Sequence, residues 1–224
     1  MRGTAFQNIG PFIAVFKGQK DIDQRVIDFY CQTTENSNNK DVCFYASYNF
    51  PAFVYVLEKD CWARFKKIYL KLARFNDGRI KKTLSNSIHE LAKILGPEIT
   101  QEDLVPIMEK FLKDPINDIR IGALKNLHVF LEDLPLKTRK SFIKFIIQTY
   151  NDAQYDWRIK HTLAKNLSHY AKLFDEEMVH SEFVPMFFMF CDNQVAKVSE
   201  TAALGLADIL DKLKSDKEKR EMII

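Results

Sequence analysis

Apolar residues recur along much of the chain with the spacing of one face of an α-helix. Between Ile80 and Leu95 they lie at i, i+4, i+8, i+11, i+12 and i+15, which places them on one side of a helix. The pattern returns after 39 residues, after a further 40 and after a further 39. The members of the four segments are Ile80, Leu84, Ile88, Leu91, Ala92 and Leu95; Ile119, Ala123, Leu127, Phe130, Leu131 and Leu134; Ile159, Leu163, Leu167, Tyr170, Ala171 and Phe174; and Val198, Ala202, Leu206, Ile209, Leu210 and Leu213. The sequence therefore predicts an internal repeat.

The pattern of a second helix precedes each of these segments. Its apolar residues are Phe65, Ile68, Tyr69 and Leu72; Leu104, Ile107, Met108 and Phe111; Ile143, Ile146, Ile147 and Tyr150; and Phe183, Met186, Phe187 and Phe190. Pro106 and Pro185 occupy the same repeat position, where proline either kinks the first helix or lies near its start. Two helices in every 39 or 40 residues predict an all-α fold, a helical-hairpin solenoid.

Short polar segments separate the predicted helices. Turns within each helix pair are expected at residues 76–79, 114–118, 151–156 and 192–194, which are rich in turn-forming residues. Gly96 and Pro97 are expected to end the helix that finishes at Leu95, and Thr100 with Asp103 forms a capping-box-like start before the next helix.

The N-terminal part of the chain is less regular. Residues 5–16 and 22–30 predict a helix pair, residues 33–41 a polar, mobile loop, and residues 42–57 a helix bent or interrupted at Pro51. We therefore expect three regions: a partial helix pair and polar loop over residues 1–41, a repeat array over 42–213, and a charged helix end over 214–224.

Composition supports a helical, non-membrane chain. Seven Gly and seven Pro in 224 residues are about half of the roughly 7% and 5% of average usage, and β-hairpins and bulges draw on glycine. No apolar stretch reaches the roughly 18 residues that span a bilayer. Phe12 to Phe16 is too short for the apolar region of a signal peptide, since Lys17 follows directly. We expect a cytoplasmic protein.

No pattern of catalytic or metal-binding residues is present in the sequence. Phosphate-binding loops, dinucleotide-binding turns and nucleophile elbows have no match, and Lys93 stands where a zinc-binding helix that begins at His89-Glu90 needs its second histidine. The four cysteines lie far apart without a C-x-x-C pair, so neither a disulfide framework nor a zinc site is indicated. His89 and His128 share a repeat position and are interpreted as structural. Asn166-Leu167-Ser168 matches a glycosylation sequon by chance. We expect no enzyme, no cofactor and no metal.

Charge is nearly balanced overall but uneven along the chain. The net charge is +3, whereas the segment from Arg64 to Lys82 holds eight basic residues and one acid, Asp77. Such a segment could meet an acidic partner or a phosphate backbone. The alternative is a solvated helix face together with a basic position that belongs to the repeat itself. A sequence pI of about 8.5 lies below the value typical of nucleic-acid-binding domains.

The repeat resembles the HEAT repeat, an armadillo-like α-α superhelix. Its length, its two helices and a basic residue early in the second helix agree with that family. The basic residues are Lys81, Arg120 and Lys160, and Ser199 departs from the pattern. The runs YNFPA (48–52), IHELAKILG (88–96) and IRIGALKNLHVFLE (119–132) are similar to those of HEAT-type regulatory subunits 1 and 4 of protein phosphatase 4 and, more weakly, to the protein phosphatase 2A scaffold. The similarity covers about residues 42–213.

The resemblance implies where partners bind. In the phosphatase scaffold, the turns inside each helix pair line up as a ridge that holds partner subunits. Transferred to this sequence, the expected exposed, partner-binding residues are Asp77, Arg79, Asp114, Asn117, Asp118, Tyr155, Asp156, Trp157, Asp192 and Asn193. Aromatic and arginine anchors would dominate the binding energy. For Trp157 the alternative is that it covers one end of the core.

The resemblance also implies a non-catalytic function. We expect a right-handed stack of helix pairs that binds the catalytic subunit of a protein phosphatase 4-type serine/threonine phosphatase, directing or modulating its activity, without contact to nucleic acid or membrane. The alternative is a HEAT adaptor of another system, such as a nuclear transport receptor. Because Phe183, Met186, Phe187 and Phe190 lie in the last well-formed pair and the chain ends at Met222-Ile223-Ile224, we also expect a segment, or a short isoform, of a longer stack.

Overall fold

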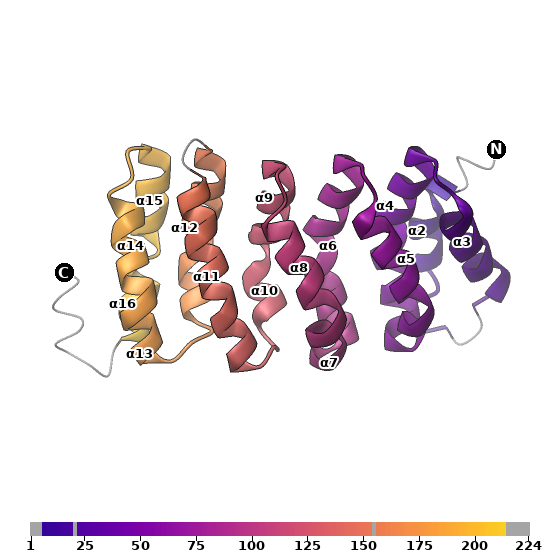
Figure 1. Ribbon diagram of the computed structural model, residues 1–224. Coiled ribbons are helices and arrows are strands. Elements are labelled where there is room, and N and C mark those ends of the chain that lie inside the picture. Colours follow the sequence, from indigo (N-terminus) through magenta and orange to yellow (C-terminus); the bar gives the residue numbers. More distant parts are fainter. Residues whose placement is uncertain (1–5, 20–21, 154–155, 214–224) are drawn as a thin grey trace. The chain divides into compact units, whose positions relative to one another are not determined.

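The computed structural model describes residues 6–19, 22–153 and 156–213. All regular secondary structure in these three ranges is helical (Figure 1). The chain divides into two compact units, Met1–Ala123 and Leu124–Ile224.

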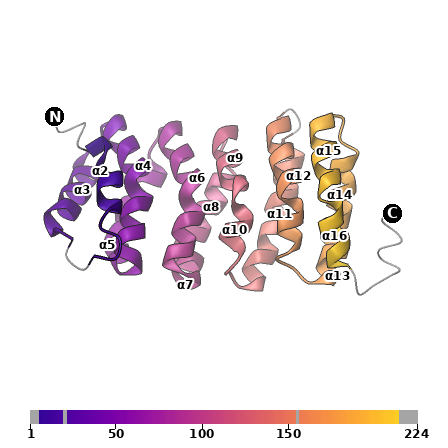
Figure 2. The same ribbon diagram turned by 180° about the vertical axis from the view of Figure 1, so that it is seen from behind.

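The first unit consists of antiparallel helices joined by short turns. They are α2 (Ile9–Ala14), α3 (Gln24–Asn36), α4 (Lys40–Leu57), α5 (Trp62–Arg74), α6 (Gly78–Leu95), α7 (Pro97–Ile99), α8 (Val105–Leu112) and most of α9 (Asn117–Lys125), with a 3₁₀ turn at η1 (Glu58–Cys61) and a π-helical turn at η2 (Thr100–Leu104). Helices α2 and α6 both pack on α4. The second helices of successive pairs therefore form one layer of this unit (Figures 1 and 2).

The second unit is built in the same way. Its helices are α10 (Leu127–Leu131), α11 (Leu136–Asp152), α12 (Trp157–Ala171), α13 (Glu176–Met178), α14 (Val184–Cys191), α15 (Ala196–Leu204) and α16 (Leu206–Lys212), with a π-helical turn at η3 (Val179–Phe183). Helix α12 packs on α15, and α14 packs on α15 within its own pair.

The core confirms the predicted repeat. Nearly all of the apolar positions that define it are buried, including Ile80, Ile119, Ile159 and Val198, which are fully inaccessible to solvent. The exceptions are half-buried: Ile147, Tyr150, Leu206 and Leu210. A helical period of 3.6 residues thus buries one face of each helix against its neighbours, and the resulting architecture is all-α and HEAT-like.

Two long helices expected from the pattern are broken. The segment 119–134 divides into α9 and α10 at Asn126, whose φ of −126° is not helical, and the segment 198–213 divides into α15 and α16 at Gly205. Helix α12 runs unbroken through the equivalent stretch. Apolar positions on both sides of each break are buried, so the core pattern alone does not show whether a helix is continuous.

The mobile loop expected at residues 33–41 is largely helical, and that prediction is wrong. Helix α3 extends to Asn36 and α4 begins at Lys40, so only residues 37–39 connect them and the expected boundary at 41/42 falls in the first turn of α4. Thr34 is buried and its hydroxyl donates to the carbonyl of Tyr30 at 2.8 Å. The amine of Lys71 holds the end of α3 by donating to the carbonyls of Thr34, Glu35 and Ser37 at 2.8, 2.8 and 2.6 Å.

The prolines at the equivalent repeat positions lie near the starts of helices, which is the second of the two predicted alternatives, and do not kink them. Pro106 and Pro185 lie in the first turns of α8 and α14, and each follows a π-helical turn. The capping-box start at Thr100 is wrong, because α7 begins earlier, with Pro97 in its first turn after Gly96. Helix α4 is continuous through Pro51. The expected charged helix end at 214–224 lies outside the described residues.

Candidate functional site

Aspartates of two turns cap the helices that follow them. Asp77 accepts a hydrogen bond from the backbone N–H of Arg79 at 2.9 Å, and Asp156 accepts one from that of Arg158 at 3.0 Å. A carboxylate at this position also complements the positive end of the helix dipole. Burial alone would raise the pKa of Asp77, but its hydrogen bonds with the backbone and guanidinium of Arg79 lower it. These two predicted site residues therefore have a structural role in their own turns.

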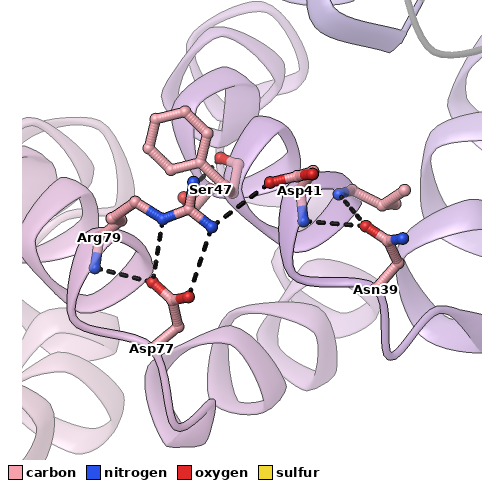
Figure 3. Close-up of polar contacts among 7 residues, drawn as sticks. Asn39, Asp41, Ser47, Asp77 and Arg79 are labelled. Carbon is pink, nitrogen blue, oxygen red and sulfur yellow. Dashed lines mark hydrogen bonds and ion pairs between the residues drawn. The ribbon is translucent and has the colours of Figure 1, made fainter.

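Arg79 connects its turn to the start of α4. Figure 3 shows its guanidinium between the carboxylates of Asp77 and Asp41. The Nη2 atom lies 3.3 Å from Oδ1 of Asp41, and the guanidinium carbon lies 5.4 Å from the ring centroid of Phe44. Asn39 caps α4 beside it by accepting from the N–H groups of Asp41 and Val42 (Figure 3). The side chain of Arg79 is still 55% exposed, so a partner can reach it.

The three predicted residues of the α8–α9 turn are engaged in internal contacts. Asp114 was expected to be exposed, but it is only 7% exposed. Its carboxylate accepts from the amine of Lys81 and from the N–H of Ile116, each at 3.0 Å. Asp118 pairs with Lys82 at 2.7 Å, and Asn117 accepts from Arg120. Asp114 is therefore a buried ion-pair partner, and its expected place on an exposed ridge is wrong.

In the second unit, three predicted residues surround one pocket. Trp157, Asp192 and Asn193 line a pocket of about 440 Å³ together with Tyr150, Lys160 and Val195. We call it the Trp157 pocket. The phenol of Tyr150 accepts from Nδ2 of Asn193 at 3.2 Å, and the amine of Lys160 lies 4.8 Å from the Tyr150 ring centroid. These contacts hold one wall of the pocket in place.

Trp157 itself is accessible to a partner. It is 47% exposed, whereas Ile159, two residues later, is fully buried. The core of α12 therefore begins after Trp157, and the exposed ring favours a surface anchor over a cover for the core end. Tyr155, also predicted for this surface, lies outside the described residues.

The basic segment at 64–82 is largely neutralised within the first unit. Arg64 pairs with Asp28 at 2.7 Å and Lys66 with Asp103 at 2.6 Å, in addition to the pairs of Arg79, Lys81 and Lys82 and the three carbonyl contacts of Lys71. Except for the local pair of Arg79 with Asp77, all of these contacts join residues that are 33 to 38 positions apart in the sequence. The structure therefore favours the second interpretation of the basic segment, in which its residues belong to solvated helix faces and to a basic position of the repeat.

Two features escaped the sequence reasoning. The rings of His128 and His169 stack with centroids 4.7 Å apart, a contact that the repeat position shared by His89 and His128 does not predict. A groove of about 840 Å³ follows α2, α4 and α6, and its lining includes Tyr48 and Pro51 of the YNFPA run. Tyr48 is 64% exposed there. The sequence showed the YNFPA run only as a similarity to phosphatase subunits, and its spacing gave no sign that the run lines a groove.

Neither a cluster of metal ligands nor an activated thiol at Cys31 or Cys61 is found within the described residues. Among the described residues, no group of three or more His, Cys, Asp and Glu side chains could hold a metal ion. Burial raises the pKa of the Cys31 thiol to about 11 and that of Cys61 to about 12, which leaves both thiols protonated and weakly nucleophilic near neutral pH. No helix in the described ranges is long and apolar enough to cross a bilayer.

Comparisons with known proteins find similarity to regulatory subunits of serine/threonine-protein phosphatases. Residues 46–150 match the family model of the protein phosphatase 4 regulatory subunit 1 middle domain. The chain is 30% identical over 203 residues to serine/threonine-protein phosphatase 4 regulatory subunit 1 of Homo sapiens and of Mus musculus, across 88% of this chain and 21% of each relative. It is 28% identical over 101 residues to the beta isoform of the human 65 kDa regulatory subunit of serine/threonine-protein phosphatase 2A, across 44% of this chain and 17% of that relative. The chain thus spans about a fifth of the length of the curated phosphatase 4 relatives it matches.

Proposed function

The chain belongs, through residues 46–150, to the protein phosphatase 4 regulatory subunit 1 family, and we propose that it binds the catalytic subunit of a phosphatase of this type and directs or modulates its activity. The relatives are named as regulatory subunits, which makes this chain homologous to non-catalytic proteins. A cytoplasmic location fits this role and is tested by imaging a fluorescently tagged chain.

The accessible Trp157 pocket is the observation that carries the proposed binding site. Large aromatic side chains that become fully desolvated in the complex dominate the energy of many interfaces. Trp157 is half-exposed beside Lys160, and Asp192 and Asn193 form the polar edge. In this proposal the chain positions the catalytic subunit near its substrates, and the catalytic subunit carries out the hydrolysis.

Capture of a phosphatase catalytic subunit tests the site. We expect the purified chain to retain the catalytic subunit of a protein phosphatase 4-type enzyme. Trp157→Ala should weaken that capture at least fivefold, because an interface hot spot contributes more than about 1 kcal/mol. Phe188→Ala is the matched control: Phe188 is 46% exposed in the same unit and does not line the pocket. Circular dichroism verifies that both variants keep their helices.

The outcomes separate the site from the family role. Unchanged capture by Trp157→Ala would overturn the Trp157 pocket as the binding site but not the phosphatase partnership. Arg79→Ala tests the first unit in the same way. Recovery of a small GTPase without a phosphatase would support the alternative, a transport adaptor.

A further inference from the structure

Most basic side chains of the segment 64–82 are paired within the first unit, so only a few of its positive charges are free to bind a ligand. Of the eight basic side chains between Arg64 and Lys82, only Lys67 and Arg74 make no ion pair or hydrogen bond within the described part of the chain. Both are exposed residues of α5. On α8, Lys110 is likewise exposed and without a partner among the described residues.

Arg74 and Lys110 share a small pocket between α5 and α8, which we call the α5–α8 pocket. Its volume is about 220 Å³, and it is lined by Leu70, Ala73, Arg74, Lys81, Ile107, Lys110, Phe111 and Asp114. It lies wholly within the first unit. Lys67 is not among its lining residues. The unpartnered cations of two helices therefore converge on one place.

The charge of this pocket favours a doubly charged anion. Three cations and one carboxylate line it. The carboxylate of Asp114 is already satisfied by Lys81 and by the N–H of Ile116, so Arg74 and Lys110 remain for a ligand. A phosphorylated side chain carries about 1.5 to 2 negative charges at pH 7 and pairs well with a guanidinium. A single carboxylate would neutralise only one of the two cations.

The size and the walls of the pocket favour a side chain over larger ligands. Its volume is below the roughly 300 Å³ at which pockets for drug-sized ligands begin, so a nucleotide does not fit. Leu70 and Ala73 line it and are half-buried, so they give it apolar walls against which the carbon atoms of a serine or threonine side chain can pack. A nucleic-acid backbone needs several cations in a row, whereas these cations line a single small pocket.

We propose that the α5–α8 pocket binds the phosphorylated serine or threonine side chain of a partner protein. The site is separate from the Trp157 pocket, and its occupation does not depend on a phosphatase partner. Arg74 holds the phosphate through its guanidinium, Lys110 adds the second positive charge, and Lys81 remains paired with Asp114.

A titration of the full chain with minimal probes tests the proposal. The probes are N-acetyl-phosphoserine N-methylamide, its glutamate counterpart and inorganic phosphate, followed by the backbone amide signals of Ala73 and Lys110 in NMR spectra. We expect saturable shifts with the phosphoserine probe, and about tenfold weaker binding for Arg74→Gln and for Lys110→Gln, since each removes a charged hydrogen-bond donor. Lys67→Gln is the matched control, with the same loss of charge on α5 outside the pocket, and leaves the affinity unchanged.

Three results would overturn the proposal. The first is the absence of saturable shifts with the phosphoserine probe. The second is equal weakening by Arg74→Gln and Lys67→Gln, which would mean diffuse attraction. The third is that inorganic phosphate or the glutamate probe binds as tightly as phosphoserine. Tighter binding at about pH 7.5 than at about pH 5, where the phosphate loses its second charge, supports it. Because no phosphatase is present in the titration, the result is independent of the proposed partnership.

Discussion

At the scale of single residues, buried asparagines join neighbouring helices through backbone carbonyls. Asn49 donates to the carbonyl of Phe6 at 3.0 Å and accepts from the N–H of Gly10 at 3.1 Å. Asn166 donates to the carbonyls of Leu124 and Thr162 at 3.4 and 3.0 Å. Asn166 is 5% exposed, so the sequon in which it stands is buried in α12 and unsuited to glycosylation.

Lys71 gives the first prediction at this scale. Replacing it with methionine keeps the length of the side chain but removes three hydrogen bonds to the carbonyl end of α3. We expect the free energy of unfolding to fall by ~1–2 kcal/mol, as for charged hydrogen bonds at a helix C-terminus. Urea denaturation measures it. Lys67→Met on the same helix has no such contacts and should stay within ~0.5 kcal/mol of the parent; an equal loss in both would contradict the role of Lys71.

His161 gives a prediction of pH dependence. Burial, followed by the charges of Lys197 and Lys165, lowers its pKa from 6.5. Below that pH the unfolded chain therefore binds more protons than the folded chain, so the free energy of unfolding declines as the pH falls below 6.5. An NMR titration of the imidazole should give a midpoint below 6.5. His161→Gln should reduce the loss of stability between about pH 7 and pH 5, and a midpoint above the ordinary value would refute the assignment.

At the scale of helices, backbone geometry determines where each element ends. Gly96 ends α6 with a φ of +84°, a conformation that favours glycine, and Pro97 then starts α7 in the first turn, where its missing N–H costs nothing. The π-helical turns before Pro106 and Pro185 recur in the repeat. These local signals set the helix pairs at a fixed period.

Gly122 gives a prediction for the packing of α9 on α6. A Cβ atom at this position would lie 2.4 Å from Oγ of Ser85 and 2.7 Å from Nδ2 of Asn86. We expect Gly122→Ala to lower the free energy of unfolding by ~1–3 kcal/mol through overpacking, as measured by thermal or urea denaturation. The double variant Gly122→Ala/Ser85→Ala removes the closest atom and should recover part of the loss. If the single variant is as stable as the parent, the close approach of the two helices is wrong.

At the scale of the molecule, ion pairs distribute the charge rather than supply much stability. Arg64–Asp28 and Lys82–Asp118 join different helices, but their side chains are 39% to 52% exposed, and exposed pairs contribute only about 0–1 kcal/mol each. Their main effect is to cancel the local positive charge that the sequence shows between residues 64 and 82.

The internal neutralisation predicts weak binding to nucleic acid. With Lys67 and Arg74 as the only unpartnered cations of this segment in the described structure, its contacts should give a plot of log affinity against log salt no steeper than about −2. Fluorescence anisotropy with a short DNA duplex at several salt concentrations measures the slope. A slope steeper than about −5 would mean that the paired cations exchange their carboxylates for phosphates, and would contradict the prediction.

The sequence by itself determined the fold class, the repeat and most of the core, because the spacing of apolar residues decides which face of each helix is buried. Ile80, Ile119, Ile159 and Val198 recur at the period of the repeat and are all buried. Element ends were less certain, as the helical residues 33–36 and the break at Asn126 show. Only the tertiary structure decided which polar residues are available to a partner. Asp114 and most of the basic segment have partners from distant parts of the chain, whereas Trp157, Arg74 and Lys110 remain accessible. Burial follows from short-range periodicity, but the partner of a charge depends on which distant helices pack together.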